Sequence, residues 1–238
     1  MSRPRKSQRG LRIGLFGGTF DPIHNGHVAV ARAARRRFRL DHIYFIPCGR
    51  PPHKDRPELS PYLHRLTMVA LACAGQAAFR PSLLEAGPDL RGLRRYYSIQ
   101  TVRRLRSLVG PRARLYFLLG ADAFLYLPTW KNFQQLVRLC EFIVAARPGF
   151  DLRRTHPVVR AVLRARLGPA RGRSVGLPES GLRIHRQRAP IYFLGDVRAA
   201  ISATEIRRAA RHHQLLAGGV PPLVAEYIEK MGLYRSRR

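Results

Sequence analysis

Residues 11–27, LRIGLFGGTFDPIHNGH, decide the fold of this chain. Their first six residues form a short apolar run that ends at Gly17-Gly18, as a buried strand of a parallel sheet does. From Gly26 onward the period becomes helical, because apolar residues recur at every fourth position: Val30, Ala34 and Phe38. Residues 43–46 then form a second apolar run, which Pro47 stops. This order predicts a β-α-β unit, in which a right-handed crossover joins two parallel strands.

The same alternation continues to the end of the chain. Further strands are predicted to end at Leu83-Leu84 and to cover 115–119, 142–146 and 191–194. Further helices are predicted near 61–74, 98–108, 122–127, 132–139, 155–166, 203–212 and 221–231. Strands that alternate with helices indicate an α/β fold with a doubly wound parallel sheet and helices on both faces.

The domain organisation follows from composition. Residues 1–10 carry four basic groups, no acid and no periodicity, which predicts a disordered basic tail. Residues 11–238 are expected to form a single domain. Within it, residues 147–190 are rich in Arg, Gly and Pro and are expected to form a surface excursion, and 48–60 a Pro-rich loop.

The charge of the chain is unusual for its length. The 238 residues include 44 Lys+Arg against 14 Asp+Glu, a formal net charge of +30. Such a charge suits nucleic acid, an anionic membrane surface or phosphorylated ligands. However, 40 of the basic residues are Arg and they occur almost everywhere, which favours codon bias over a dedicated binding surface. We therefore expect no specific nucleic-acid partner.

Membrane and redox classes are also disfavoured. No stretch approaches the roughly 18 apolar residues of a membrane span. The three cysteines, Cys48, Cys73 and Cys140, are too far apart for a zinc knuckle or a redox dithiol. An odd number of cysteines without a secretory signal is typical of a cytoplasmic protein.

The junction between the first strand and the first helix carries the clearest chemistry. Ligands of open α/β sheets bind at the carboxyl ends of the strands. Gly17 and Gly18 lack Cβ atoms, so a phosphate can approach their amides. His24 and His27 lie on one side of the helix start, where the positive helix dipole end also favours anions. No cysteine lies near them in the sequence, and no metal site is predicted.

A second polar segment, Ile201-Ser202-Ala203-Thr204-Glu205-Ile206-Arg207, has two compatible interpretations. Ser202 and Glu205 have the spacing of a capping box, which would start a helix. The free amides of that helix start would also suit phosphates, with Arg207 as a charged donor one turn on. A hydroxyl engaged in capping would not contact phosphate itself.

Together these two segments resemble the nucleotidyltransferase superfamily with a H-x-G-H motif on a Rossmann-like fold. Its members transfer a nucleotidyl group from a nucleoside triphosphate and release pyrophosphate. Three further segments resemble the nicotinate mononucleotide adenylyltransferases within it: 45–54, 95–101 and 120–131. The second departs from the family pattern at Tyr96 and Gln100.

The resemblance implies a role for each matching residue. His24 and His27 would act at the reacting phosphates. The ATP-binding residues would be Gly17, Gly18, Thr19, Phe20, Asp122, Ser202, Thr204 and Arg207. The mononucleotide-binding residues would be His53, Lys54, Tyr97, Ser98 and Trp130. Mg²⁺ would arrive on the ATP phosphates, and the products would be deamido-NAD and pyrophosphate.

Alternatives stay open at this point. A sister adenylyltransferase acting on nicotinamide mononucleotide or phosphopantetheine would share most of these motifs. A nucleic-acid-binding protein on the same fold would explain the +30 charge, although it has no use for both phosphate motifs. Trp130 would serve equally well as a core aromatic, and whether the chain forms a homo-oligomer is not predicted.

Overall fold

A computed structural model describes residues 10–235, apart from 51–58, 89–90, 92–93, 147–148, 169–190, 196, 198–200, 213 and 215. The predicted disordered tail therefore lies outside the described residues except for Gly10. Much of the predicted excursion at 147–190 lies outside them as well.

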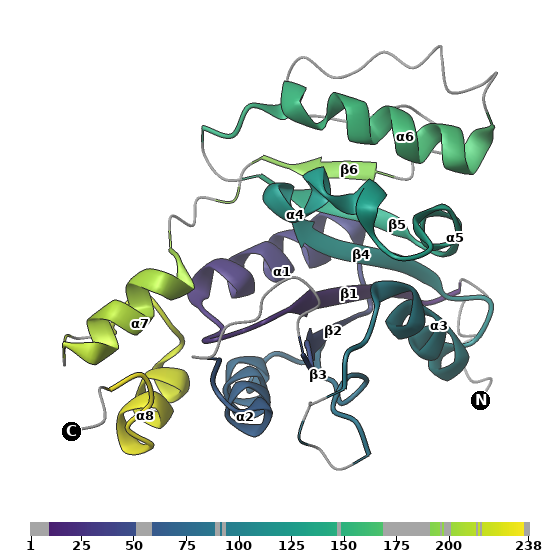
Figure 1. Ribbon diagram of the computed structural model, residues 1–238. Coiled ribbons are helices and arrows are strands. Elements are labelled where there is room, and N and C mark those ends of the chain that lie inside the picture. Colours follow the sequence, from purple (N-terminus) through teal and green to yellow (C-terminus); the bar gives the residue numbers. More distant parts are fainter. Residues whose placement is uncertain are drawn as a thin grey trace, which may run out of the picture.

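Six parallel strands form the sheet, as the sequence predicts (Figure 1). They are β1 (Arg12–Gly18), β2 (His42–Pro47), β3 (Phe79–Pro81), β4 (Arg114–Gly120), β5 (Glu141–Ala145) and β6 (Ile191–Leu194). Their spatial order is β3-β2-β1-β4-β5-β6, so the winding direction reverses between β1 and β4. This is the doubly wound order, in which the crevice at the reversal point binds ligands.

The described helices agree with the predicted ones to within a few residues. They are α1 (Asn25–Phe38), α2 (Tyr62–Cys73), α3 (Ser98–Val109), α4 (Ala121–Leu125), α5 (Phe133–Leu139), α6 (His156–Leu167), α7 (Ala203–Arg211) and α8 (Pro222–Lys230). Two short 3₁₀ helices are η1 (Leu127–Thr129) and η2 (Leu152–Thr155). None of the described helices is long and apolar enough to cross a membrane.

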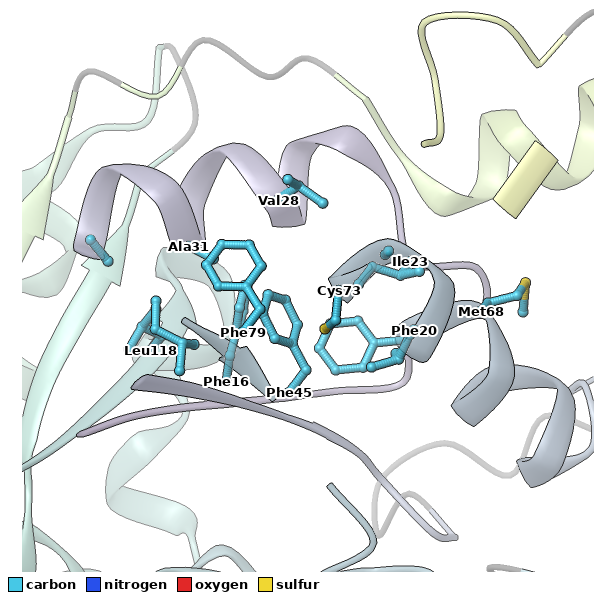
Figure 2. Packing of buried hydrophobic residues seen from close by; sticks show 14 of the residues in the cluster. Phe16, Phe20, Ile23, Val28, Ala31, Phe45, Met68, Cys73, Phe79 and Leu118 are labelled. Carbon is cyan, nitrogen blue, oxygen red and sulfur yellow. The ribbon is translucent and has the colours of Figure 1, made fainter. Parts of the chain in front are cut away.

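Each face of the sheet has its own core. On one face, α1 and α2 contact the sheet and α8 packs on α2, with Phe16, Phe20, Phe45 and Met68 buried in the core that these helices share with α7 (Figure 2). On the other face, α3, α4, α5 and α6 cover the sheet. The burial of apolar side chains on both faces explains why the strands are nearly continuous apolar runs rather than alternating ones.

Two sequence predictions need correction. The third strand ends at Pro81 rather than at Leu83-Leu84, and Leu83 is 55% exposed. Proline has no N–H for the sheet, and the next amide, of Ser82, makes a last hydrogen bond to the Phe45 carbonyl at 2.9 Å before the chain turns. In α1 the buried stripe is Val28, Ala31, Ala34 and Phe38, so Val30 lies at its margin and is only half-buried.

Candidate active site

The loop after β1 is shaped by one aromatic ring. Phe20 is 2% exposed and has a left-handed backbone with φ 49°. Its ring lies over Gly18, where a Cβ atom would approach the ring carbons to 3.0–3.3 Å. Packing against the Phe20 ring thus favours glycine at position 18. A Cβ atom at Gly17 would meet only the Phe117 ring, at 3.8 Å, and Gly17 itself is exposed. The open backbone expected for phosphate approach is therefore at Gly17.

The two histidines meet at the start of α1, as their spacing predicts. Their rings stack at a centroid distance of 3.7 Å and an interplanar angle of 28°. The main-chain N–H of His24 donates to Nδ1 of His27 at 3.2 Å. An Nδ1 that accepts a hydrogen bond carries no proton, so the proton of the neutral His27 ring is on Nε2. The edge-on contact with Phe20, at 5.0 Å, fixes this ring further. His27 is therefore oriented as an Nε2–H donor.

The second motif reaches the first through Arg207. Its guanidinium donates to the main-chain carbonyl of Asp21 at 2.7 Å and to the Thr204 hydroxyl at 3.3 Å. Ser202 and Glu205 form the predicted capping box: Oγ of Ser202 accepts from the Glu205 amide at 3.2 Å, and the Glu205 carboxylate accepts from the Ser202 amide at 3.1 Å. The hydroxyl of Ser202 is thus engaged in capping α7.

The predicted mononucleotide side gathers around the start of α3. Tyr97 is the N-cap of this helix, and its amide donates to the Gln100 side chain at 3.0 Å. Gln100, which departs from the family pattern, therefore caps the helix. Lys131 lies 4.4 Å above the Tyr97 ring, and Trp130 packs edge-on against Phe117 at 5.8 Å. Lys131 therefore lies beside Tyr97, and Trp130 precedes it in the chain.

The other predicted residues stand as follows. Ser98 is the first residue of α3, and Asp122 is exposed in the first turn of α4, directly after β4. Thr19 lies half-buried between Gly18 and Phe20. His53 and Lys54 lie outside the described residues.

Sequence reasoning missed Arg65, whose side chain connects loops on both sides of the site. This side chain is 1% exposed, and it donates to the carbonyls of Thr19 at 2.9 Å, Cys48 at 2.7 Å, Ser60 at 3.0 Å and Gly49 at 3.2 Å. One guanidinium thus connects the loop after β1, the loop after β2 and the start of α2. The available signal was its spacing, because residue 65 falls on the buried stripe of α2 between Tyr62 and Val69.

A partly buried carboxylate, also missed, lies next to this cluster. Glu85 accepts from the Thr101 hydroxyl at 2.6 Å and from the Gly49 amide at 3.4 Å. Burial raises the pKa of Glu85 above its ordinary value, and the hydrogen bond from Thr101 offsets part of that increase. This carboxyl group supports the loop after β2.

The combination of a doubly wound parallel sheet, glycines at its reversal point and cationic side chains beside helix starts defines a nucleotide-binding α/β protein. Comparison with known proteins makes this assignment specific. Residues 15–209 match the family model described as cytidylyltransferase-like. A probable nicotinate-nucleotide adenylyltransferase of Moorella thermoacetica is 40% identical over 226 residues, covering 95% of this chain and 93% of that protein.

Two further comparisons agree. A probable nicotinate-nucleotide adenylyltransferase of Neisseria meningitidis is 40% identical over 226 residues, covering 94% of this chain and 98% of that protein. The structure of Plasmodium falciparum nicotinic acid mononucleotide adenylyltransferase complexed with NaAD shares the fold, with a TM-score of 0.67 at 19% identity, covering 94% and 97% of the two chains. The chain belongs to the nicotinate-nucleotide adenylyltransferases of the cytidylyltransferase-like family.

Proposed function

We propose that the protein transfers the adenylyl group of ATP to nicotinate mononucleotide, giving deamido-NAD and pyrophosphate in NAD biosynthesis. The observation that carries this proposal is the hydrogen bond between Arg207 and the Asp21 carbonyl, 2.7 Å long and spanning 186 residues. It brings the two phosphate-type motifs to one place, three residues from His24. Membership of the family indicates the class of reaction. The contact between the two motifs indicates where in the protein we propose that the reaction takes place.

The chemistry requires charge stabilisation more than proton transfer. A phosphate monoester is an anion near pH 7, so the mononucleotide phosphate attacks the α-phosphorus without a general base. As the bond to the bridging oxygen breaks, negative charge grows on the leaving pyrophosphate. Preformed donors aimed at that charge lower the barrier. His27 supplies such a donor at Nε2, and the stacked His24 ring holds it in place.

The start of α7 takes the β- and γ-phosphates in this proposal. Its free amides near Thr204 face the anion, and Arg207 adds a charge-assisted donor. Since Ser202 caps the helix through its hydroxyl, its contribution is the helix start itself. Gly17 offers an open amide in the crevice, and Asp122 accepts hydrogen bonds from the adenosine.

The mononucleotide occupies the other side of the crevice. The main chain at Tyr97 and Ser98, together with the Trp130 ring, holds the nicotinate, while His53 and Lys54 meet the mononucleotide phosphate. Holding both anionic substrates in line supplies much of the rate enhancement, because the reaction within the complex becomes effectively unimolecular.

Mg²⁺ enters with ATP in this proposal, bound by phosphate oxygens and water. The donors at the site fit that arrangement. The side-chain oxygens of Asp21 already accept from the Ser60 amide at 3.3 Å and the Tyr234 hydroxyl at 2.8 Å, so they are engaged by the protein. Among the described residues, no group of three or more His, Cys, Asp or Glu side chains could hold a metal ion.

A dedicated nucleic-acid role gains no support from the arginines. Several of them donate to main-chain carbonyls and so act within the fold: Arg65, Arg80, Arg104, Arg106, Arg138, Arg166 and Arg207. The three cysteines are free, which accords with the cytoplasmic location that we keep as part of the proposal.

A pyrophosphate-release assay tests the function. ATP is combined in turn with nicotinate mononucleotide, nicotinamide mononucleotide and phosphopantetheine. We expect the highest kcat/KM with nicotinate mononucleotide. A higher value with either other cosubstrate would assign the chain to a sister enzyme, and no release with any of them would refute adenylyl transfer.

A further inference from the structure

Asp21 is the point where distant parts of the chain meet the histidine motif. This aspartate is 6% exposed and lies three residues before His24. Its carboxylate accepts from the Ser60 amide at 3.3 Å and from the Tyr234 hydroxyl at 2.8 Å. Its carbonyl accepts from Arg207 at 2.7 Å. The last two partners belong to the C-terminal part of the chain, so the ATP-side loop is held from there.

The same C-terminal part also holds the residue after His24. The main-chain N–H of Asn25 donates to the Gly219 carbonyl at 3.0 Å, and its side-chain amide donates to the Gly218 carbonyl at 2.9 Å. Gly218 has a positive φ of 78°, which glycine adopts without strain. His24 is therefore fixed on both sides, by contacts from Tyr234 and from the turn before α8.

Both the backbone and the hydroxyl of Tyr234 are held in place by the fold. Its backbone is left-handed, with φ 68°, a conformation that is disfavoured for a tyrosine and that surrounding contacts must maintain. Burial and the adjacent Asp21 charge raise the pKa of its hydroxyl, so it remains a proton donor at physiological pH. The Sδ atom of Met68, on α2, lies 3.9 Å from the hydroxyl.

A second tyrosine anchors the C-terminal part through a contact with α2. The Tyr227 hydroxyl, on α8, lies 2.8 Å from Nδ1 of His64 on α2. This contact and the Tyr234–Asp21 hydrogen bond both join the C-terminal part to the rest of the protein through a phenolic hydroxyl. Of these two contacts, the Tyr234–Asp21 hydrogen bond reaches the histidine motif. A comparison of the two tyrosines therefore distinguishes anchoring of the C-terminal part from positioning of the motif.

We infer that Tyr234 is a positioning residue of the active site. Through the Asp21 carboxylate it holds the loop that carries His24 and the carbonyl that orients Arg207, and so links the end of the chain to the triphosphate site. The inference deepens the proposed function and rests on it for its kinetic readout. ATP binding provides a second readout that needs no turnover.

The test compares Tyr234→Phe with the matched control Tyr227→Phe in the full chain. Each variant loses one hydroxyl and keeps its ring. We expect Tyr234→Phe to weaken ATP binding several-fold in calorimetry and to lower kcat about tenfold, since small misplacements of reacting groups are costly. KM for the mononucleotide should stay near that of the wild type. Tyr227→Phe should leave ATP binding and kcat within about twofold.

Two outcomes would overturn the inference. Equal losses in both variants would show that the tyrosines only anchor the C-terminal part. Unchanged ATP binding in Tyr234→Phe, with thermal unfolding like that of the control, would show that Asp21 needs no such contact. If the wild type binds ATP but turns over no cosubstrate, the proposed function fails, while the ATP dissociation constants of the two variants still decide this inference.

Discussion

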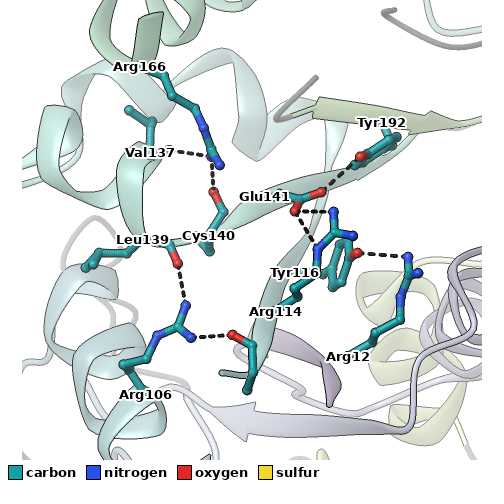
Figure 3. A network of polar contacts seen from close by, with 11 residues as sticks. Arg12, Arg106, Arg114, Tyr116, Val137, Leu139, Cys140, Glu141, Arg166 and Tyr192 are labelled. Atoms are coloured by element: carbon teal, nitrogen blue, oxygen red, sulfur yellow. Dashed lines mark hydrogen bonds and ion pairs between the residues drawn. The ribbon is translucent and has the colours of Figure 1, made fainter. Parts of the chain in front are cut away.

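The two ends of the parallel sheet differ in the partners of their charged side chains. At the amino ends of the strands, an arginine pairs with a glutamate, while Arg106 and Arg166 nearby donate to main-chain carbonyls (Figure 3). Arg114 donates to Glu141 at 2.7 Å, and Glu141 also accepts from the Tyr192 hydroxyl at 2.9 Å. Arg12 donates to the Tyr116 hydroxyl at 2.8 Å beside this pair. These side chains thus find hydrogen-bonding partners within the protein.

At the carboxyl ends, two arginines and two carboxylates form hydrogen bonds with neutral partners. Arg65 and Arg207 donate to main-chain carbonyls. Asp21 and Glu85 accept from amides and hydroxyls. A neutral partner satisfies the hydrogen bonds of a cation but does not cancel its charge. The comparison indicates that Arg114 and Glu141 use charge for cohesion at the amino end, and we propose that Arg207 at the carboxyl end keeps its charge for anionic substrates.

The largest effect is expected at Arg65. Arg65→Met removes the donor for carbonyls in three segments and should cost about 3–5 kcal/mol of stability, because several hydrogen bonds to a charged group, each contributing about 1.5–3 kcal/mol, are lost together. Denaturant unfolding measures the loss. The control is Arg138→Met, because Arg138 is exposed and donates to one carbonyl, of Ala165, at 3.1 Å. It should cost about 1 kcal/mol or less. Similar losses in both variants would contradict a special role for Arg65.

The next effect concerns the reacting centre. His27→Ala, and to a similar degree His24→Ala, should lower kcat by about 10²–10³, as loss of one transition-state donor does. Substrate affinity should change much less. His42, at the amino end of β2, is the matched control, and His42→Ala should leave kcat within a few-fold. Near-normal kcat in the His27 variant would remove it from the reacting centre and weaken the contrast between the two ends.

Trp130 should show a smaller effect, on one substrate. Stacking of an aromatic ring on a flat heteroaromatic contributes roughly 1–3 kcal/mol, and the pyridinium charge adds cation–π attraction. Trp130→Ala should raise KM for nicotinate mononucleotide about ten- to a hundredfold, and KM for ATP should barely change. Trp130 is the only tryptophan, so the mononucleotide alone should also quench the fluorescence of the wild type.

Because Trp130 packs on Phe117, its loss will also reduce stability, and Trp130→Phe separates the two effects by keeping an aromatic contact. Unquenched fluorescence at saturating mononucleotide, together with a stability defect in the Ala variant, would make Trp130 a core residue only.

The amino end should respond in stability and not in catalysis. Glu141→Gln removes the charge that Arg114 and Tyr192 contact. Hydrogen bonds to a charged group contribute about 1.5–3 kcal/mol, and the half-exposed Arg114 side chain reduces this to about 1–2 kcal/mol through solvent screening. Thermal unfolding and kcat are measured on the same sample. A tenfold loss of kcat without a loss of stability would show that the amino end contributes to function.

The sequence predicted most of the fold because each core face imposes a period. The apolar run of β1, the helical period of α1 and the capping pair of α7 are local signals, and all three appear in the structure. Where the signal was an isolated pair of apolar residues, at Leu83-Leu84, the prediction was wrong, because edge-strand pairing had already ended at Pro81.

The site was only partly predictable, for a similar reason. Glycines, histidines and the capping pair form short motifs, so they are visible along the chain. Arg65, Glu85 and Tyr234 act through contacts between residues far apart in the sequence, and no local pattern encodes which carbonyl or carboxylate each one meets. Asp21 stood within the quoted motif, but its partners Ser60 and Tyr234 lie 39 and 213 residues away.

The smallest expected effect is on the pH dependence of stability. It is tested with two carboxyl groups whose pKa values change in opposite directions on folding. Burial raises the pKa of Glu85 above its ordinary value of 4.5, so the folded protein binds this proton more tightly than the unfolded chain does. The stability that follows is present below pH 4.5 and is lost as the pH rises through the higher folded pKa. Each unit of pKa difference corresponds to about 1.4 kcal/mol. Glu85→Gln cannot ionise, so it avoids this loss.

The free energy of unfolding of Glu85→Gln, minus that of the wild type, should therefore increase from about pH 4.5 upward and then level off. Urea unfolding of both proteins between pH 3 and 8 measures this difference, and the other titrating groups cancel in it. The control is Glu226→Gln, because the exposed Lys230 lowers the pKa of Glu226, so its difference should change in the opposite direction and below about pH 4.5. A flat difference for Glu85→Gln would show that folding does not raise the pKa of Glu85, and the contrast between the two ends would then rest on the arginines alone.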